Sequence, residues 1–181
     1  MGPDPIQIMR IGIDARPYGP GGVGRYSGKL VTNLEKIDRV NDYFVFLRKE
    51  NFDLYQPKNP RFHKVLADYS VYSLKEQIFL PFKLCQYHLD LVHFPHFNAP
   101  LFYWAPFVVT IHDLIMHERT RQATTRNLLV FYLKKFFYFI VIRNAIRRAQ
   151  RIIAVSRFTK EAIIKRYKIK PEKIIVTYES A

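Results

Sequence analysis

The sequence predicts an α/β protein whose core is a doubly wound, mostly parallel, Rossmann-like sheet. Three observations support this fold class. Short apolar runs rich in β-branched residues alternate along the chain with longer segments of helical period. Several of the short runs are apolar throughout, which is typical of parallel strands covered by helices on both faces. Six of the seven glycines fall between residues 12 and 28, where the first strand gives way to the first helix.

Each element of this fold has a local signal in the sequence. Apolar runs predict strands over 8–14, 42–48, 62–66, 90–95, 106–113, 151–156 and 173–178. Apolar residues three and four positions apart predict helices over 25–37, 73–88, 126–150 and 157–167. Pro81 falls inside the second of these helices and predicts a kink there.

The 181 residues are enough for one domain with a sizeable core. Residues 1–8 are interpreted as a vector-derived or disordered leader, and residues 9–181 as one Rossmann-like domain. The chain stops directly after its last strand, which indicates a cut at a domain boundary. The single cysteine, Cys85, excludes an internal disulfide and is expected to be buried, in a protein of the reducing cytoplasm. The apolar runs are too short to predict a transmembrane helix.

The formal net charge of +14 is placed unevenly. Residues 119–173 carry 16 Lys and Arg against two Glu, and the rest of the chain is neutral. Such a basic segment favours an anionic membrane surface, nucleic acid or a phosphorylated ligand as a partner.

The glycine-rich turn predicts a site for an anion or a sugar phosphate. It follows the first strand and opens the first helix, whose free N–H groups and partial positive charge suit a phosphate. Gly21, Gly22 and Gly24 would let the backbone lie against such a ligand. The glycines begin too far after the strand for a dinucleotide fingerprint, and no Gly-Lys-Ser or Gly-Lys-Thr follows them as in a Walker A loop. The alternative is a flexible loop without a ligand.

Polar residues also follow three other predicted strands. His93, His96 and Asn98 come from one strand, His112 and Asp113 from the next, and Ser156 from a later one. Because the carboxyl ends of parallel strands share one edge of the sheet, these side chains are expected to form a site. His93 alone is equally explained as a core histidine, and Ser156 as a helix cap that could also bind a ligand. No His, Asp or Glu spacing here predicts a closed metal site.

These segments carry a family resemblance. "IGIDAR…GGVGRY", "DLVHFPHFNAPL", "PFVVTIHDLI" and "IIAVSRFTKEAIIKRYKIKPEKIIVTYE", in this order and spacing, resemble the N-terminal half of a family 4 glycosyltransferase. The bacterial mannosyltransferase-like members are the most similar. The resemblance covers roughly residues 9–180 and rests on all four motifs together.

The resemblance implies the N-terminal half of a GT-B fold, in which two Rossmann-like domains face each other across a cleft. It implies that this half binds a glycan or lipid-linked acceptor, that a missing C-terminal domain holds most of the nucleotide sugar, and that the isolated chain lacks turnover. Transfer would retain the anomeric configuration without a metal or another cofactor.

The resemblance also assigns roles to single residues. The loop of Gly21, Gly22, Val23, Gly24 and Arg25 would contact the donor diphosphate or the acceptor. His112 would be the catalytic residue, hydrogen-bonding and polarising the reacting sugar. The acceptor-side residues would be Tyr26, His93, His96 and Asp113.

The segment 126–151 combines large apolar residues with seven basic ones. One interpretation is a helix packed on the sheet, and the other is a patch that docks on the inner face of the cytoplasmic membrane. A nucleic-acid-binding module is disfavoured because no reader motif accompanies the charge. A nucleotide-cofactor oxidoreductase is disfavoured because the second strand ends in basic residues, not an acidic one.

Overall fold

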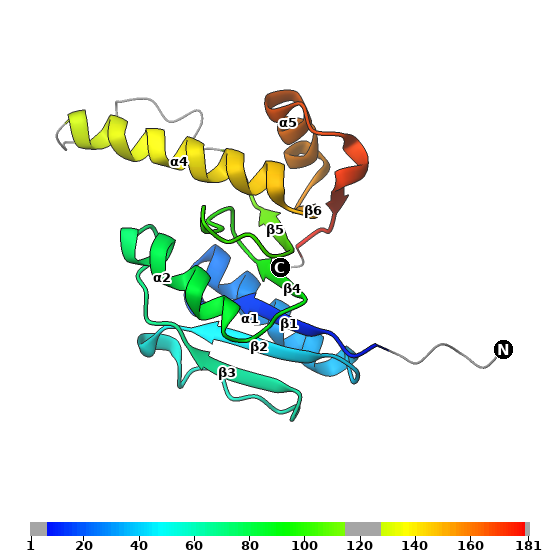
Figure 1. The fold of residues 1–181 in the computed structure, drawn as a ribbon. Coiled ribbons are helices and arrows are strands. Elements are labelled where there is room, and N and C mark those ends of the chain that lie inside the picture. Colours follow the sequence, from blue (N-terminus) through cyan, green and yellow to red (C-terminus); the bar gives the residue numbers. More distant parts are fainter. Residues whose placement is uncertain (1–6, 115–127, 180–181) are drawn as a thin grey trace.

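The computed structural model describes residues 7–114 and 128–179 and contains one seven-stranded sheet. All strand pairs are parallel, in the spatial order β3-β2-β1-β4-β5-β6-β7 (Figure 1). This confirms the predicted α/β, Rossmann-like fold. The strands are β1 Arg10–Asp14, β2 Asp42–Leu47, β3 Phe62–Leu66, β4 Leu91–Phe94, β5 Phe107–Ile111, β6 Arg151–Ala154 and β7 Ile174–Val176.

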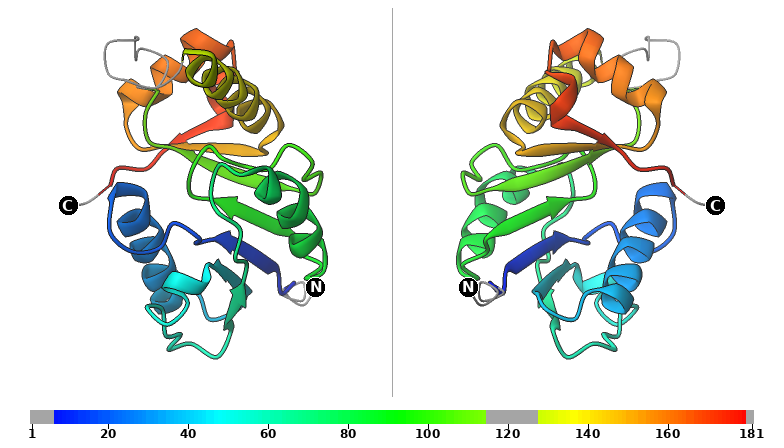
Figure 2. Two further views of the ribbon diagram at one scale, coloured as in Figure 1. Left: turned by 90° about the vertical axis from the view of Figure 1, so that its left-hand side faces the viewer. Right: turned by 90° about the vertical axis from the view of Figure 1, so that its right-hand side faces the viewer.

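In the part of the chain that the structure describes, four α-helices and two short 3-10 turns connect these strands. The helices are α1 Gly22–Ile37, α2 Leu74–Cys85, α4 Leu128–Arg148 and α5 Arg157–Tyr167, and the turns are η1 Lys49–Asn51 and η3 Pro171–Lys173. In Figure 2, α1 and α2 lie on opposite faces of the sheet. The core residues agree, since α1 contributes to one hydrophobic cluster while α2, α4 and α5 contribute to the other.

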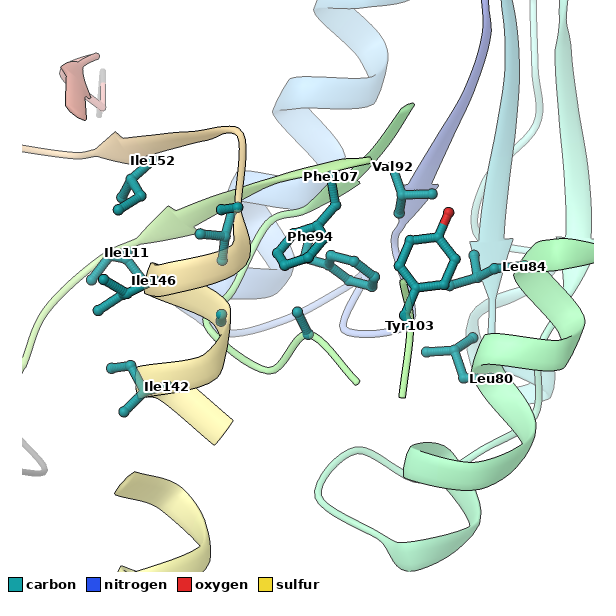
Figure 3. Packing of buried hydrophobic residues seen from close by; sticks show 14 of the residues in the cluster. Leu80, Leu84, Val92, Phe94, Tyr103, Phe107, Ile111, Ile142, Ile146 and Ile152 are labelled. Carbon is teal, nitrogen blue, oxygen red and sulfur yellow. The ribbon is translucent and has the colours of Figure 1, made fainter. Parts of the chain in front are cut away.

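The alternation of side chains along each strand builds these two clusters. In β2, Phe44 and Phe46 point to the face of α2 and α4, whereas Tyr43 and Val45 point to α1. Figure 3 shows the larger cluster, in which side chains of α2 and α4 pack on either side of residues from β4 and β5. The labelled members are Leu80, Leu84, Val92, Phe94, Tyr103, Phe107, Ile111, Ile142, Ile146 and Ile152.

The chain reverses its winding direction between β1 and β4. From β1 the chain moves outward to β2 and β3, and it then crosses back to place β4 beside β1. Segments that follow β1 and β4 therefore diverge at the carboxyl edge of the sheet, and ligands of open α/β sheets bind at such a point.

Two details differ from the sequence-based expectations. The first helix begins at Gly22 and not at Arg25, because Gly21 adopts a φ of 97° and lets the chain enter the helix directly. Cys85 is exposed and not buried, because it lies on the outer side of α2, one residue after the buried Leu84. Of the predicted leader, residues 1–6 lie outside the described residues, as do residues 126 and 127 of the predicted basic segment.

Candidate active site

His112 lies directly after β5 at the carboxyl edge of the sheet, with its side chain 17% exposed. Its Nε2 donates to the carbonyl oxygen of Pro95 at 2.8 Å, and its Nδ1 lies 2.7 Å from Oε1 of Glu179. A carbonyl oxygen only accepts, so Nε2 carries a proton. The contact between Nδ1 and Oε1 needs a second proton, on the ring or on the carboxyl group. The imidazole is therefore held at both of its nitrogens.

Tyr26 connects α1 to this histidine. Its ring meets that of His112 edge-on, with centroids 4.9 Å apart. Its hydroxyl lies 3.1 Å from Oγ1 of Thr110, which in turn lies 2.8 Å from Nε2 of His93. A hydrogen-bonded chain thus runs from α1 through β5 to β4. Burial raises the pKa of Tyr26, with a smaller increase from the charge of Glu179, so its hydroxyl stays protonated.

His93 is a buried member of this chain, with 7% exposure. Burial, and secondly the nearby His112, lowers the pKa of His93 to about 4, so the ring is neutral at pH 7. This environment fits the core-histidine interpretation. His93 orients Thr110 and through it Tyr26.

His96 lies nearer the surface than His93. Its ring stacks near that of His112, at 6.2 Å between centroids, and its Nδ1 lies 3.3 Å from the hydroxyl of Tyr72. Burial, with a contribution from His112, lowers the pKa of His96 to about 4. A neutral imidazole beside His112 can accept or donate one hydrogen bond to a sugar hydroxyl.

The glycine-rich turn places the start of α1 next to these side chains. Gly21 is the N-cap, no side chain caps the helix, and its first turn holds no acidic residue. Gly21 and Gly22 are exposed, and a Cβ added at either would meet no atom within 4 Å. The exposed N–H groups at this end can therefore bind an anion.

Three further residues of the predicted loop have different surroundings. A Cβ on Gly24 would lie 2.5 Å from the carbonyl oxygens of Pro17 and Gly19, so Gly24 is required by packing. Val23 is half-buried, and its carbonyl accepts from the hydroxyl of Ser27. Arg25 is exposed on the first turn of the helix.

Asp113 and Ser156 border the site. Asp113 is exposed and follows His112 directly. Ser156 caps α5, as predicted, because its hydroxyl accepts from the backbone N–H of Thr159 at 3.0 Å. The hydroxyl of Thr159 donates to the carbonyl of His112 at 3.2 Å, so this cap also supports the His112 backbone.

A buried charged cluster lies beneath the site and was missed by the sequence interpretation. Arg16 is 2% exposed and donates to both carboxylate oxygens of Asp14, at 2.7 and 2.8 Å, and also to Glu76. Glu76 further accepts from the side-chain amide of Asn98 and the backbone N–H of Tyr72, both at 2.7 Å. This cluster fastens the loops after β1 and β4 to the start of α2. Asn98, expected in the site, belongs to this cluster.

Asp14 is the last residue of the first predicted strand, and Glu179 directly follows the last predicted strand. The rule that found His93, His96 and His112 also applies to the first and last strands, and would have selected these two carboxylates. Within residues 7–114 and 128–179, no group of three or more His, Cys, Asp or Glu is placed to hold a metal ion. A shallow hollow of about 420 Å³ lies elsewhere, at the start of β6, and is lined by residues that include Arg151, Lys168 and Lys173.

Solved structures that are similar to the chain include the following three. The lipopolysaccharide outer core galactosyltransferase WaaB in its apo form gives a TM-score of 0.57 at 15% identity, over 96% of this chain and 46% of that chain. An alpha-glucosyltransferase in complex with UDP and a 13-mer DNA containing a HMU base gives 0.49 at 16%, over 94% and 42%. The PbgP3 protein from Burkholderia pseudomallei gives 0.43 at 11%, over 82% and 52%.

The first of these structures supports the fold, and the chain spans about half the length of each of the three. A comparison with curated proteins gave no match. The sequence profile of Glycosyltransferase Family 4 matches residues 20–179, which is most of the chain and includes Tyr26, His112 and Glu179. The chain therefore belongs to glycosyltransferase family 4.

Proposed function

We propose that this chain is the acceptor-side domain of a retaining glycosyltransferase that transfers a hexose from a nucleotide sugar to a glycan or lipid-linked acceptor. By resemblance the hexose is mannose. The supporting observation is the convergence of Tyr26, His96 and His112 with the uncapped start of α1 at one edge of the sheet. Hydrogen-bonding groups of this kind suit sugar hydroxyls, and the helix end suits a phosphate.

In the transfer, the bond between the anomeric carbon and the diphosphate oxygen breaks. The nucleoside diphosphate leaves with the electron pair of that bond. A bond from the anomeric carbon to the acceptor oxygen forms, and the proton of the acceptor hydroxyl passes to the departing diphosphate or to water. His112 hydrogen-bonds a hydroxyl of the reacting sugar and stabilises the charge that develops there, since its Nδ1 points to the place now taken by Glu179. The N–H groups of Gly21, Gly22 and Val23 with Arg25 bind the diphosphate or the acceptor.

The acceptor-side set comprises Tyr26, His93, His96 and Asp113, in two layers. His96 and Asp113 are the members that an acceptor can touch, because both reach the surface of the edge. His93 and Thr110 stand behind Tyr26 and hold its hydroxyl. The reaction in this scheme needs no metal and no cofactor beyond the nucleotide sugar.

The proposal that a second domain holds most of the donor is tested with the chain alone. Incubated with nucleotide sugars and glycan or lipid-linked acceptors, the chain is expected to give no turnover, because most of the donor site lies in a second domain. Robust transfer by the chain alone would contradict this division.

The proposed activity itself is tested with a two-domain protein that carries this chain as its N-terminal half. Transfer of radiolabelled sugar into a lipid or glycan fraction is expected with one of the common nucleotide sugars. His112→Ala should abolish most of it, whereas His63→Ala, at an exposed histidine on β3, should not. Absence of transfer with every donor, together with no shift of the His96 and His112 NMR signals when nucleotide sugar or acceptor is added, would contradict the proposal.

A further inference from the structure

The helices α2 and α4, which lie on the opposite face of the sheet from α1, expose an unusual amount of apolar surface. On α2, Leu74, Ile78 and Phe82 are spaced four residues apart and are 75%, 47% and 68% exposed, with Phe79 beside them. These side chains form one stripe along the outer side of the helix. The inner side of the same helix packs into the core through Leu80 and Leu84 (Figure 3).

The helix α4 is longer than the strands that it covers. Its 21 residues span about 31 Å, whereas the five residues of β5 span about 16 Å. The C-terminal part, from Val141 to Ile146, supplies the buried side chains. The preceding part exposes large side chains, and these are Tyr132, Leu133, Phe136, Phe137 and Ile140.

Residues 97–104 join the two helices into one surface. The backbone N–H of Leu101 donates to Gln77 on α2, and its carbonyl accepts from Arg148 on α4. Arg148 also lies over the ring of Trp104, at 4.1 Å, and Trp104 is 78% exposed. We call the exposed side chains of α2 and α4, with Phe102 and Trp104, the aromatic–basic face.

Charge complementarity identifies the occupant of this face. The helix α4 has no acidic residue from Leu128 to Arg148, and the single acid of α2, Glu76, is buried. Lys75 and Lys134 are exposed among the apolar side chains, and Lys135 is half-exposed. Trp and Tyr at the surface, interleaved with Lys and Arg and without acids, match the chemistry of a bilayer interface that carries anionic lipids. No helix in the described part of the chain is long and apolar enough to cross a membrane.

We infer that the aromatic–basic face docks the protein on an anionic lipid bilayer. The inference extends the membrane contact predicted for segment 126–151 to α2 and the 97–104 connection. The face also adjoins the candidate site, since Phe97 contacts Tyr138 of α4 at 4.9 Å and Tyr72, just before α2, reaches His96. Resting on the proposed function, this placement assigns the acceptor to the lipid-linked class, because the acceptor residues open beside the membrane.

Vesicle co-sedimentation tests the docking. The full chain is mixed at low salt with vesicles of equimolar phosphatidylcholine and phosphatidylglycerol, and with vesicles of phosphatidylcholine alone. Binding is expected for the anionic vesicles and should weaken as salt is raised. Equal binding to both kinds of vesicle, or no binding to the anionic ones, would overturn the inference.

Two pairs of matched variants distinguish vesicle binding through this face from binding through the overall positive charge of the chain. Lys134→Glu with Lys135→Glu should weaken binding about tenfold or more. Lys29→Glu with Lys36→Glu changes the net charge equally, on exposed positions of α1, and should have a small effect. Phe82→Ser with Phe136→Ser should also weaken binding, whereas Ile37→Ser, 75% exposed on α1, should not. Equal losses from the two charge pairs would mean that the face is not the docking surface.

Other occupants are outcomes of the same experiments. A dimer in light scattering that dissociates with Phe82→Ser and Phe136→Ser, without vesicle binding, would assign the face to a second copy and overturn the inference. Vesicle binding needs no sugar, so it is independent of the transfer assay. Docking without transfer would support the aromatic–basic face as a docking surface and contradict the proposed function. Transfer to a soluble acceptor without docking would support the proposed function and contradict the docking surface.

Discussion

Glu179 and His112 are in contact across the carboxyl edge of the sheet, with Oε1 and Nδ1 2.7 Å apart. The opposite nitrogen, Nε2, is already used by the carbonyl of Pro95. Glu179 is 41% exposed and His112 only 17%, so the glutamate can leave while the histidine stays. The carboxylate thus occupies the position from which a substrate oxygen would bind Nδ1.

The first prediction concerns this pair. In the two-domain protein, His112→Ala should lower transfer by about 100-fold or more, because a hydrogen bond to the developing charge is lost. Glu179→Ala should lower it far less and should leave ligand binding at the edge intact or stronger, since the competing carboxylate is gone. Steady-state transfer and binding titrations measure both. A larger loss of transfer from Glu179→Ala than from His112→Ala would show that Glu179, and not His112, is the main catalytic group.

The second prediction compares two glycines of the same turn. Gly22→Ala places its Cβ in open space and should leave Tm nearly unchanged, while a ligand that lies against this backbone would bind more weakly. Gly24→Ala drives its Cβ to 2.5 Å from two carbonyl oxygens and should destabilise the chain by about 1–3 kcal/mol. That loss lowers Tm by roughly 2–4 °C per kcal/mol, measured by thermal unfolding. If Gly22→Ala changes neither Tm nor ligand binding, the turn is a loop without a ligand.

The sequence predicted the fold well because buried parallel strands are continuous apolar runs. All seven strands and all four helices lie where expected, with ends shifted by a few residues. The exposure of α4 could not be predicted, because large apolar residues occupy most of the circumference of that helix. Which part is covered depends on the length of the sheet beneath it, and that is a tertiary property.

The candidate site was predicted only in part. Polar residues at strand ends are visible in the sequence, so His93, His96 and His112 were found, and the structure brings them together. The contact between Arg16 and Glu76 joins residues 60 positions apart, and nothing local to either residue signals it. The glycine cluster indicated a ligand, yet Gly12 and Gly24 have no room for a Cβ, so packing explains part of it.

The third prediction concerns pH. Burial lowers the pKa of His93 to about 4 from its ordinary value of 6.5. Between these values the unfolded chain binds a proton that the folded chain does not, so the free energy of unfolding falls as pH falls through this window. The stability is complete above pH 6.5 and is lost by roughly 3 kcal/mol toward pH 4, at about 1.4 kcal/mol per pH unit.

Urea unfolding between pH 7.5 and pH 4 measures this slope, and NMR of the imidazole measures the titration directly. His93→Gln keeps a polar group beside Thr110 but cannot titrate, so its slope should be shallower. His96 shifts in the same direction, so part of the slope remains. An His93 signal that titrates near 6.5 in the folded chain would contradict the buried, neutral state.

The fourth prediction concerns the buried charges beneath the site. Arg16 is the single cation between two buried carboxylates, Asp14 and Glu76. Arg16→Met leaves both without a cationic partner and should lower the free energy of unfolding by about 3–5 kcal/mol. Glu76→Gln removes one negative charge and leaves the two-point contact of Arg16 with Asp14, so it should cost only about 1 kcal/mol.

The pH dependence of these variants distinguishes lost charge pairing from lost packing. In Arg16→Met, Glu76 should take up a proton as the pH falls, because burial raises the pKa of its carboxyl and the opposing charge of Arg16 is gone. The deficit relative to the unchanged chain should therefore be largest at neutral pH and should shrink toward pH 4. Combining Arg16→Met with Glu76→Gln should recover part of the stability, since one buried charge is gone. A deficit that is constant with pH, and additive in the double variant, would mean that Arg16 acts by filling space and not by pairing the two acids.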